Sequence, residues 1–257
     1  MYEHPGTPPD TVTVVWCTTE RDERATARSM LLRTAADLLA VRASEIWLGH
    51  ESGGRPYVGG AAGGLRVSVS HGRGAAAVAV SACTPVGVDI EAVRRLPGRA
   101  LARSWFAGSE AEWLGTLPEG ERATAFLWLW TQKESVGKAL GRGLRGGGMR
   151  RPVPLPGRWP PAAGGIAPRP VPGSAGLASG AALLDGGRFV VGVATAPDPG
   201  PPGGPEGPCG PGGSAGGGNG AGSHGGWTPL VDGGRGPAGS GGGPRVVVRR
   251  VAAPAPG

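Results

Sequence analysis

Acidic side chains that could hold a metal ion occur near residue 90. Asp89 and Glu91 alternate with the apolar residues Val88 and Ile90, so a β-strand would place both carboxylates on one face. Two such carboxylates repel each other unless a cation lies between them, and Mg²⁺ is the cation that a small set of oxygen ligands suits best. A half-exposed strand with a chance acidic face is the alternative interpretation.

A second set of charged groups lies downstream, in the segment FLWLWTQKESVGKALGRGL at residues 126–144. As a helix, this segment places Trp130, Glu134 and Lys138 on one stripe, with Trp130 explained best by core packing. Lys133 and Lys138 are the only lysines in the chain, and lysine, unlike arginine, has a pKa that shifts readily. We expect Glu134 to supply a third carboxylate, with Lys138 beside it. An ordinary Glu–Lys surface pair is the alternative.

A possible anion site follows a predicted strand, in the sequence Ser70-His71-Gly72-Arg73. A turn there would combine an imidazole, backbone N–H groups and a guanidinium, which together suit a phosphate. Taken alone, the pattern is more typical of a turn with solvated side chains. The same holds for Arg55, which lies in a Gly-Arg-Pro turn.

The elements that must position these groups indicate an α+β fold. Alternating apolar residues predict strands, with a hairpin turning at 71–74, and helical spacing predicts four helices, one starting with a capping box of Ser109 and Glu112. Strands are expected at 11–17, 46–48, 65–70, 75–81, 86–93, 181–184 and 188–195, and helices at 21–41, 99–106, 109–117 and 119–140. Each hairpin follows a helix, so the order predicts two similar halves, residues 1–85 and 86–196.

Residues 197–257 are nearly all glycine, proline, alanine and serine. Such a segment buries too little apolar surface to offset the entropy of ordering the backbone, so we expect a disordered tail. Within it, Val246–Val251 is the only candidate for order.

The whole composition predicts a soluble protein of a reducing compartment, the cytoplasm. The three cysteines are far apart and form no CxxC motif, and the N-terminus lacks the charge and apolar run of a signal peptide. No run reaches the roughly 20 apolar residues of a membrane span. The net charge of +7 favours anionic partners such as phosphates, nucleic acids or acidic proteins.

Taken in order, four motifs resemble a known family. GRPYV, VSVSHG, VGVDIE and WTQKESVGKALGRGL are similar to the G-[KR]-P, S-H, G-[VI]-D-[VI]-E and W-x-x-K-E-x-x-x-K motifs of the 4′-phosphopantetheinyl transferases of the Sfp type. The resemblance implies two similar α+β halves, a pseudo-dimer with the active site in the cleft between them. It also implies a monomeric enzyme that transfers the 4′-phosphopantetheine arm of coenzyme A to a serine of an apo acyl or peptidyl carrier protein, with Mg²⁺ and release of 3′,5′-ADP.

The resemblance assigns a role to each candidate residue. Glu134 and Lys138 would be catalytic, with Glu134 or a metal-bound water as the base and Lys138 facing the pyrophosphate. The metal ligands would be Asp89, Glu91 and Glu134. The residues that would bind coenzyme A are Arg28, Arg55, Ser70, His71, Lys133 and Lys138.

Two other functions remain open from the residues alone. A basic nucleic-acid-binding protein would use the arginines and tryptophans, but it leaves the acidic pair of the strand unexplained. A Mg²⁺-dependent phosphodiesterase would use the same three acids, but it would need further ligands, and the chain has only four histidines.

Overall fold

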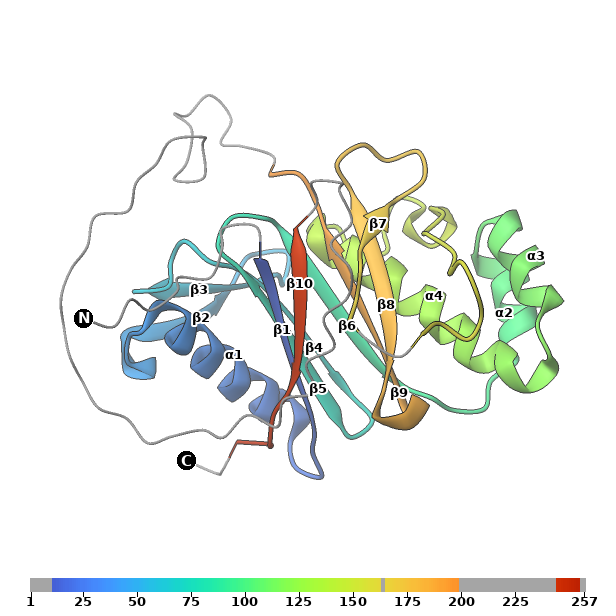
Figure 1. Ribbon diagram of the computed structural model, residues 1–257. Coiled ribbons are helices and arrows are strands. Elements are labelled where there is room, and N and C mark those ends of the chain that lie inside the picture. The colour runs from blue at the N-terminus through green and yellow to red at the C-terminus, as the bar shows by residue number, and fades with distance from the viewer. Residues whose placement is uncertain (1–10, 163–164, 199–243, 255–257) are drawn as a thin grey trace.

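The computed structural model describes residues 11–162, 165–198 and 244–254, and these form an α+β fold, as predicted. The first half contains a four-stranded sheet with the strand order β10-β1-β5-β4, one long helix and a separate two-stranded sheet (Figure 1). Its elements are β1 (Thr11–Thr18), α1 (Glu23–Leu39), a 3-10 helix (Ala43–Glu45), β2 (Ile46–His50), β3 (Pro56–Gly60), β4 (Arg66–Gly72) and β5 (Ala75–Ser81), joined by β10 (Arg245–Arg250).

The second half contains a sheet with the order β6-β9-β8-β7, crossed by the longest helix, α4. Two short helices, α2 and α3, pack at the end of α4 that lies away from the first half (Figure 1). The elements are β6 (Val86–Ala92), α2 (Gly98–Trp105), α3 (Gly108–Thr116), α4 (Glu119–Ala139), β7 (Arg169–Pro170), β8 (Ala178–Leu184) and β9 (Phe189–Thr195), with 3-10 helices at Gly148–Arg150 and Asp185–Gly187.

The two halves repeat one topology. In the first, β1 leads through α1 to the hairpin β4–β5, and β5 pairs between β1 and β4. In the second, β6 leads through α4 to the hairpin β8–β9, and β9 pairs between β6 and β8. The sequence order of two hairpins, each after a helix, reflects this repetition.

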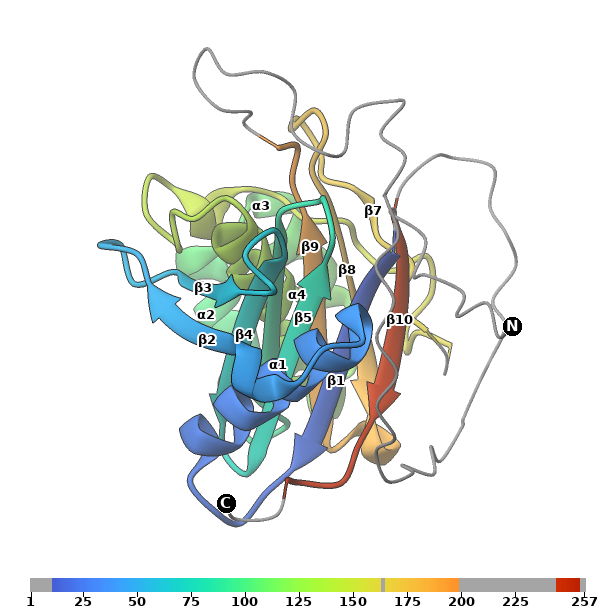
Figure 2. The ribbon, with the colours of Figure 1, turned by 90° about the vertical axis from the view of Figure 1, so that its left-hand side faces the viewer.

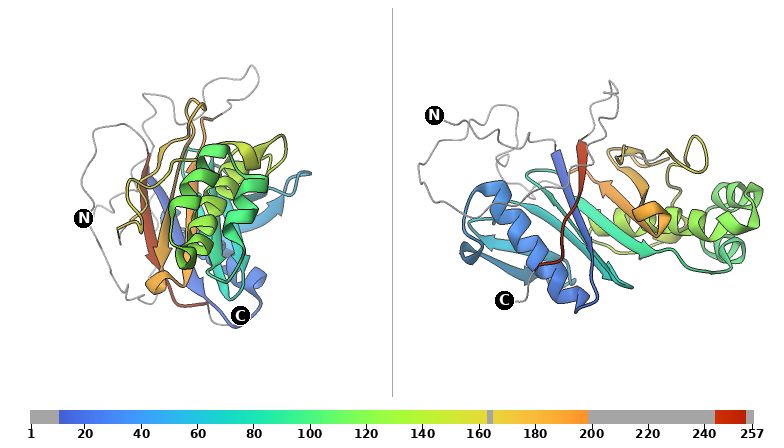
Figure 3. Two further views of the ribbon diagram at one scale, coloured as in Figure 1. Left: turned by 90° about the vertical axis from the view of Figure 1, so that its right-hand side faces the viewer. Right: turned by 60° about the horizontal axis from the view of Figure 1, so that its bottom comes forward.

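The repeated halves stack as four layers, with α1 and α4 outermost. One apolar cluster joins α1 to the first sheet, a second lies between the two sheets, and a third joins α4, α2 and α3 to the second sheet. Figures 2 and 3 show α1 running across the strands of the first sheet, away from α4. Because strands alternate their side chains, each sheet contributes to two of the three clusters. The edge strands β4 and β6 meet where the sheets adjoin.

Two glycines let α4 approach the second sheet closely. A Cβ on Gly87 of β6 would overlap the carbonyl oxygen of Ser135, and a Cβ on Gly192 of β9 would overlap the backbone of Thr131. Val86, Val88 and Ile90 face the first sheet, so the predicted alternation along β6 is confirmed. The acidic face of β6 is therefore the face that α4 covers.

Some local predictions are wrong. The β4–β5 hairpin turns at Arg73 and Gly74, which both have positive φ (52° and 83°), as a tight two-residue turn requires; His71 is thus a strand residue and not a turn residue. Helix α3 is not capped by Ser109 and Glu112. Instead, Glu110 accepts a hydrogen bond from the backbone N–H of Ala107 (3.0 Å).

The segment Val246–Val251, the one candidate for order in the predicted tail, is confirmed as ordered, so the predicted disorder does not hold at residues 245–250. These residues form β10, which runs parallel to β1 and pairs with it from Thr11↔Arg245 to Trp16↔Arg250. Residues 199–243 lie outside the described residues.

The structure describes two cysteines, Cys17 and Cys83. Cys17 is a buried thiol, whereas Cys83 is disulfide-bonded, which the cysteine spacing does not predict. In the described part of the chain, no helix is long and apolar enough to cross a membrane.

Candidate active site

Asp89 joins three elements at the edge where the two halves meet. The residue is 6% exposed, and its Oδ1 accepts hydrogen bonds from Ser70 Oγ of β4 (2.7 Å) and from Lys138 Nζ of α4 (2.9 Å). Lys138 Nζ also donates to the carbonyl oxygen of Val88 (2.9 Å). Ser70 comes from the first half and Lys138 from the second, so Asp89 marks the junction.

Two serines of β4 bind the backbone of β6 directly. The N–H of Val88 donates to Ser68 Oγ (3.0 Å) and the N–H of Ile90 donates to Ser70 Oγ (3.3 Å). Both serine side chains are buried. The edge strands of the two sheets are thus held together by side-chain hydroxyls.

The second oxygen of Asp89 has no partner. Oδ2 is buried and accepts no hydrogen bond from any residue that the structure describes. A buried carboxylate oxygen without a donor costs about 1–3 kcal/mol or more. This atom therefore favours an added donor or cation at the junction.

Glu134 lies one turn before Lys138 on α4 and is half-buried. Burial raises the pKa of Glu134, and the neighbouring charges of Asp89 and Glu91 raise it further, while Lys138 acts in the opposite direction. Asp89, Glu91 and Glu134 therefore repel one another, and the positive charge of Lys138 opposes this repulsion.

The residues fit a magnesium ion by their chemistry. Three carboxylates, one with an unpartnered oxygen and one with a raised pKa, are the hard oxygen donors that Mg²⁺ prefers. Within the described ranges, however, no three His, Cys, Asp or Glu side chains are arranged as a finished metal site. Lys138 binds one oxygen of Asp89, and Arg94 Nη1 binds Glu91 Oε2 (2.7 Å).

The structure brings Arg55 to the end of α4, but it does not bring His71 or Arg28 to Asp89. The guanidinium of Arg55 lies against Gly141, just after α4, so this residue of the first half reaches the second. His71 is exposed and follows Ser70 on a strand, so it points to the other face. Arg28 is exposed on α1, on the outer side of the first sheet.

Lys133, expected to bind coenzyme A, is buried elsewhere. Its Nζ pairs with Glu110 of α3 (2.7 Å), donates to the carbonyl oxygen of Arg151 and lies 4.8 Å from the ring of Phe106. Glu110 Oε1 also accepts from the N–H of Val153 (2.8 Å). Lys133 therefore fixes α4 to its surroundings, and its side chain is not available to a ligand.

Sequence reasoning missed the role of Glu110. The signal that could have found it is an acid in the first turn of a helix that is otherwise apolar on its inner face. Trp130 packs as expected, since its ring lies 6.0 Å from that of Phe126 and 5.9 Å from that of Trp105.

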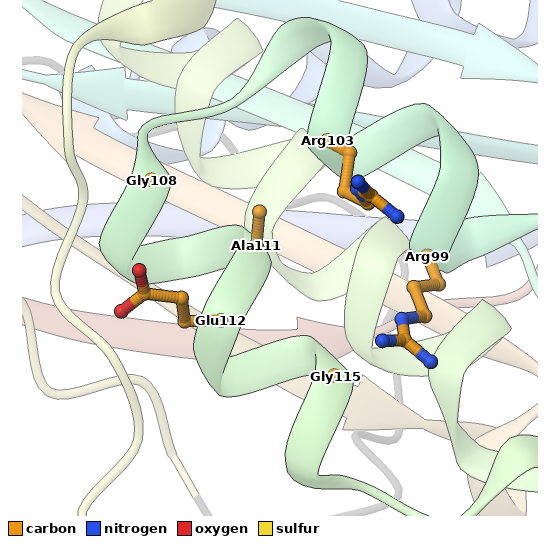
Figure 4. A pocket seen from close by; sticks show the side chains of 6 residues that line it. All are labelled: Arg99, Arg103, Gly108, Ala111, Glu112 and Gly115. Atoms are coloured by element: carbon orange, nitrogen blue, oxygen red, sulfur yellow. The ribbon is translucent and has the colours of Figure 1, made fainter.

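A pocket between α2 and α3 lies apart from this cluster (Figure 4). Arg99 and Arg103 of α2 lie on one side of it, and the carboxylate of Glu112 of α3 points away from them. The six residues that line it are Arg99, Arg103, Gly108, Ala111, Glu112 and Gly115, and none of them is a candidate site residue.

Comparison with known proteins finds similarity in the segment that contains Asp89. Residues 85–154, which contain Asp89, Glu91, Glu134 and Lys138, match the model of the 4′-phosphopantetheinyl transferase superfamily. Over 129 residues the chain is 33% identical to the 4′-phosphopantetheinyl transferase HetI of Nostoc sp.. The matched stretch covers 49% of this chain and 54% of that protein.

Two further relatives match over shorter stretches. The 4′-phosphopantetheinyl transferase gsp of Aneurinibacillus migulanus is 37% identical over 60 residues, 23% of this chain and 25% of that protein. A putative 4′-phosphopantetheinyl transferase of Synechocystis sp. is 33% identical over 81 residues, 31% of this chain and 33% of that protein. The matches span about half the length of the Nostoc protein and less of the other two. By its segment 85–154 and by these relatives, the chain is similar to the 4′-phosphopantetheinyl transferase superfamily.

Proposed function

We propose that this chain is an enzyme that transfers the 4′-phosphopantetheine arm of coenzyme A to a serine of an apo acyl or peptidyl carrier protein, and that it requires Mg²⁺. The observation that carries the proposal is the group of three carboxylates and one lysine at the junction of the halves, inside the segment that matches the family. The relatives named above are 4′-phosphopantetheinyl transferases, which supports this reaction over nucleic-acid binding or phosphodiester hydrolysis.

Asp89, Glu91 and Glu134 are the residues that would hold the magnesium ion. When bound, Mg²⁺ supplies positive charge that neutralises the pyrophosphate of coenzyme A, the largest electrostatic demand in phosphoryl transfer. The unpartnered Oδ2 of Asp89 is the ligand atom best prepared for it, because it lacks any other donor among the described residues.

Glu134 is the proposed general base. Its carboxylate accepts the proton of the carrier serine while the serine oxygen forms a bond to the β-phosphorus of coenzyme A. The bond from that phosphorus to the bridging oxygen breaks, and its electron pair leaves with 3′,5′-ADP. In the metal-free protein, burial raises the pKa of Glu134, and a raised pKa makes a carboxylate a stronger base.

Lys138 is the proposed partner of the leaving group. In the structure its Nζ is held by Asp89 Oδ1 and the carbonyl oxygen of Val88, and the side chain is 28% exposed. The ammonium group is therefore oriented but still accessible, and its charge would stabilise the phosphate of the departing 3′,5′-ADP.

The first half supplies the remaining proposed contacts to coenzyme A. Ser70 holds Asp89, Arg55 reaches the end of α4, and His71 and Arg28 are exposed side chains available to the outer phosphates. One chain supplies every one of these residues, which supports activity as a monomer. The basic net charge of +7 would attract an acidic carrier protein.

Intact-mass measurement tests the proposal. The protein is incubated with coenzyme A, Mg²⁺ and a panel of apo carrier proteins, and each carrier should gain the mass of one phosphopantetheine arm. Glu134→Gln should abolish the gain while coenzyme A still binds. Glu119→Gln, an exposed glutamate on the same helix, is the matched control and should leave the gain unchanged. Full activity of Glu134→Gln would remove Glu134 from its proposed role.

A further inference from the structure

The strand β10 returns from the end of the chain to the first strand of the fold. Beyond its pairing with β1, the N–H of Val251 donates to the carbonyl oxygen of Trp16 (3.0 Å), and Arg21 Nη1 donates to the carbonyl oxygen of Pro254 (3.3 Å). Val246 and Val248 pack against the apolar cluster that both halves share. The segment 244–254 is thus part of the first sheet and of the boundary between the sheets.

Arg250 crosses from this strand to the second half. Its Nη1 bonds Asp185 Oδ1 (2.9 Å), in the turn between β8 and β9, and its guanidinium stacks 4.9 Å from the ring of Trp16. The Trp16 ring in turn lies 6.1 Å from that of Phe189 at the start of β9. An ion pair, a cation–π contact and an aromatic pair therefore meet across one boundary.

Arg250 lies in the same row of the sheet as a residue of the candidate site. The pairing register aligns Arg250 with Trp16, Trp16 with Ala77, and Ala77 with Ser70, so one row spans all four strands. At one end of the row Ser70 bonds Asp89 (2.7 Å), and at the other Arg250 bonds Asp185 (2.9 Å). Both contacts join the first half to the second.

We propose that β10 is an intramolecular clasp, and that Arg250 is a positioning residue that holds the two halves in register for the Ser70–Asp89 contact. Among the described strands, the two sheets share no backbone ladder, so their alignment depends on the apolar cluster and on a few polar contacts at the edges. If one edge is released, the halves can rock about the other. The catalytic part of this inference rests on the proposed function, but the structural part does not.

Amide hydrogen exchange tests the clasp without any substrate. The N–H groups of Val88 and Ile90 bond to serines of the opposite half, so their exchange rates report how often the halves separate. Arg250→Gln should speed both by about three- to tenfold, the range expected for losing one partly exposed ion pair and one cation–π contact. Arg249→Gln is the control, since Arg249 is exposed and has no side-chain partner among the described residues.

A second variant addresses the same contact from the other side. Asp185→Asn should reproduce the faster exchange, and the double variant with Arg250→Gln should exchange no faster than the faster single variant. Because Asp185 also binds Arg188 (2.8 Å), Arg188→Gln controls for that lost ion pair and should leave Val88 and Ile90 unchanged.

The outcomes separate the clasp from the reaction. Equal exchange of Val88 and Ile90 in Arg250→Gln and Arg249→Gln overturns the clasp, whatever the activity. Faster exchange together with a lower kcat/KM for carrier modification in Arg250→Gln alone supports its catalytic role. Faster exchange with an unchanged kcat/KM overturns the positioning role. If the wild-type protein modifies no carrier, the proposed function fails, and the exchange data still decide the clasp.

Discussion

At the scale of single residues, the two oxygens of Asp89 have different environments. Oδ1 is bonded by Ser70 and Lys138, whereas Oδ2 is buried without a donor among the described residues. Burial and the charges of Asp89 and Glu91 raise the pKa of Glu134 beside it. A protein that arranges unsatisfied negative charge in this way accepts a cost to stability, and a cation bound there would offset that cost.

The raised pKa of Glu134 predicts a pH dependence of stability in metal-free buffer. The folded state holds the Glu134 proton more tightly than the unfolded state, in which the pKa is near the ordinary glutamate value of 4.5. The stability that this proton confers is fully present below that value and is lost as the pH rises through the folded pKa. Glu134→Gln lacks this loss, so the variant should become more stable than the wild type as the pH approaches neutrality.

Thermal unfolding with a chelator, measured from acidic to neutral pH, checks this prediction. Glu119→Gln, from the exposed start of α4, should follow the wild type. Added Mg²⁺ should stabilise the wild type more than Glu134→Gln. A constant difference between Glu134→Gln and the wild type across the pH range would contradict the prediction.

Single residues also show what the sequence could and could not predict about the site. Alternation along β6 and helical spacing along α4 are local signals, and they were enough to predict the acidic face of Asp89 and the stripe of Glu134 and Lys138. Lys133 is buried away from the site because it pairs with Glu110, a residue 23 positions away. A helical or strand period in the sequence cannot predict a pair at that separation. His71 was misplaced because Arg73 and Gly74 form a tighter turn than predicted.

At the scale of elements, the position of α4 depends on close backbone approach to β6. Gly87→Ala would drive a methyl group into the carbonyl oxygen of Ser135, forcing the helix away from the strand. We expect a loss of about 1–3 kcal/mol in the free energy of unfolding, together with loss of transfer activity.

Gly120→Ala is the matched control on α4, because a Cβ there meets no atom within 4 Å. Alanine is a better helix residue than glycine, so this variant should gain up to about 1 kcal/mol. Chemical denaturation measures both variants. Equal stability of Gly87→Ala and the wild type would mean that α4 does not need this approach.

The buried pair of Lys133 and Glu110 gives a second prediction for α4. Lys133→Met leaves Glu110 as a buried charge without its partner and should cost about 3–5 kcal/mol. Replacing both residues, as Lys133→Met with Glu110→Leu, should recover part of this loss. Denaturation of the two variants decides the matter, and a Lys133→Met protein as stable as the wild type would contradict a structural role for the pair.

Lys138→Met provides the contrast within the same helix. Its side chain is partly exposed and pairs with Asp89, so its loss should change the free energy of unfolding by less than the loss of Lys133. The effect on transfer should be the reverse, with Lys138→Met the more damaging, because only Lys138 lies among the three carboxylates.

At the scale of the whole molecule, the fold repeats one α+β unit, and the candidate site lies where the edge strands of the two units meet. The α+β class was predictable because each half contains its own helix and hairpin with clear local patterns. The strand β10 was not, because its pairing with β1 joins residues more than 200 positions apart. Its only local signal, the run of valines at 246–248, does not identify the strand with which it pairs.

Transfer from coenzyme A to an apo carrier protein is the central claim, and intact mass of the carrier measures it directly. With coenzyme A and Mg²⁺, the wild-type protein should add one phosphopantetheine arm per carrier, and Glu134→Gln should add none while Glu119→Gln behaves as the wild type. No gain in mass on any of several acyl and peptidyl carriers, from wild-type protein that is folded and binds coenzyme A, would contradict the account.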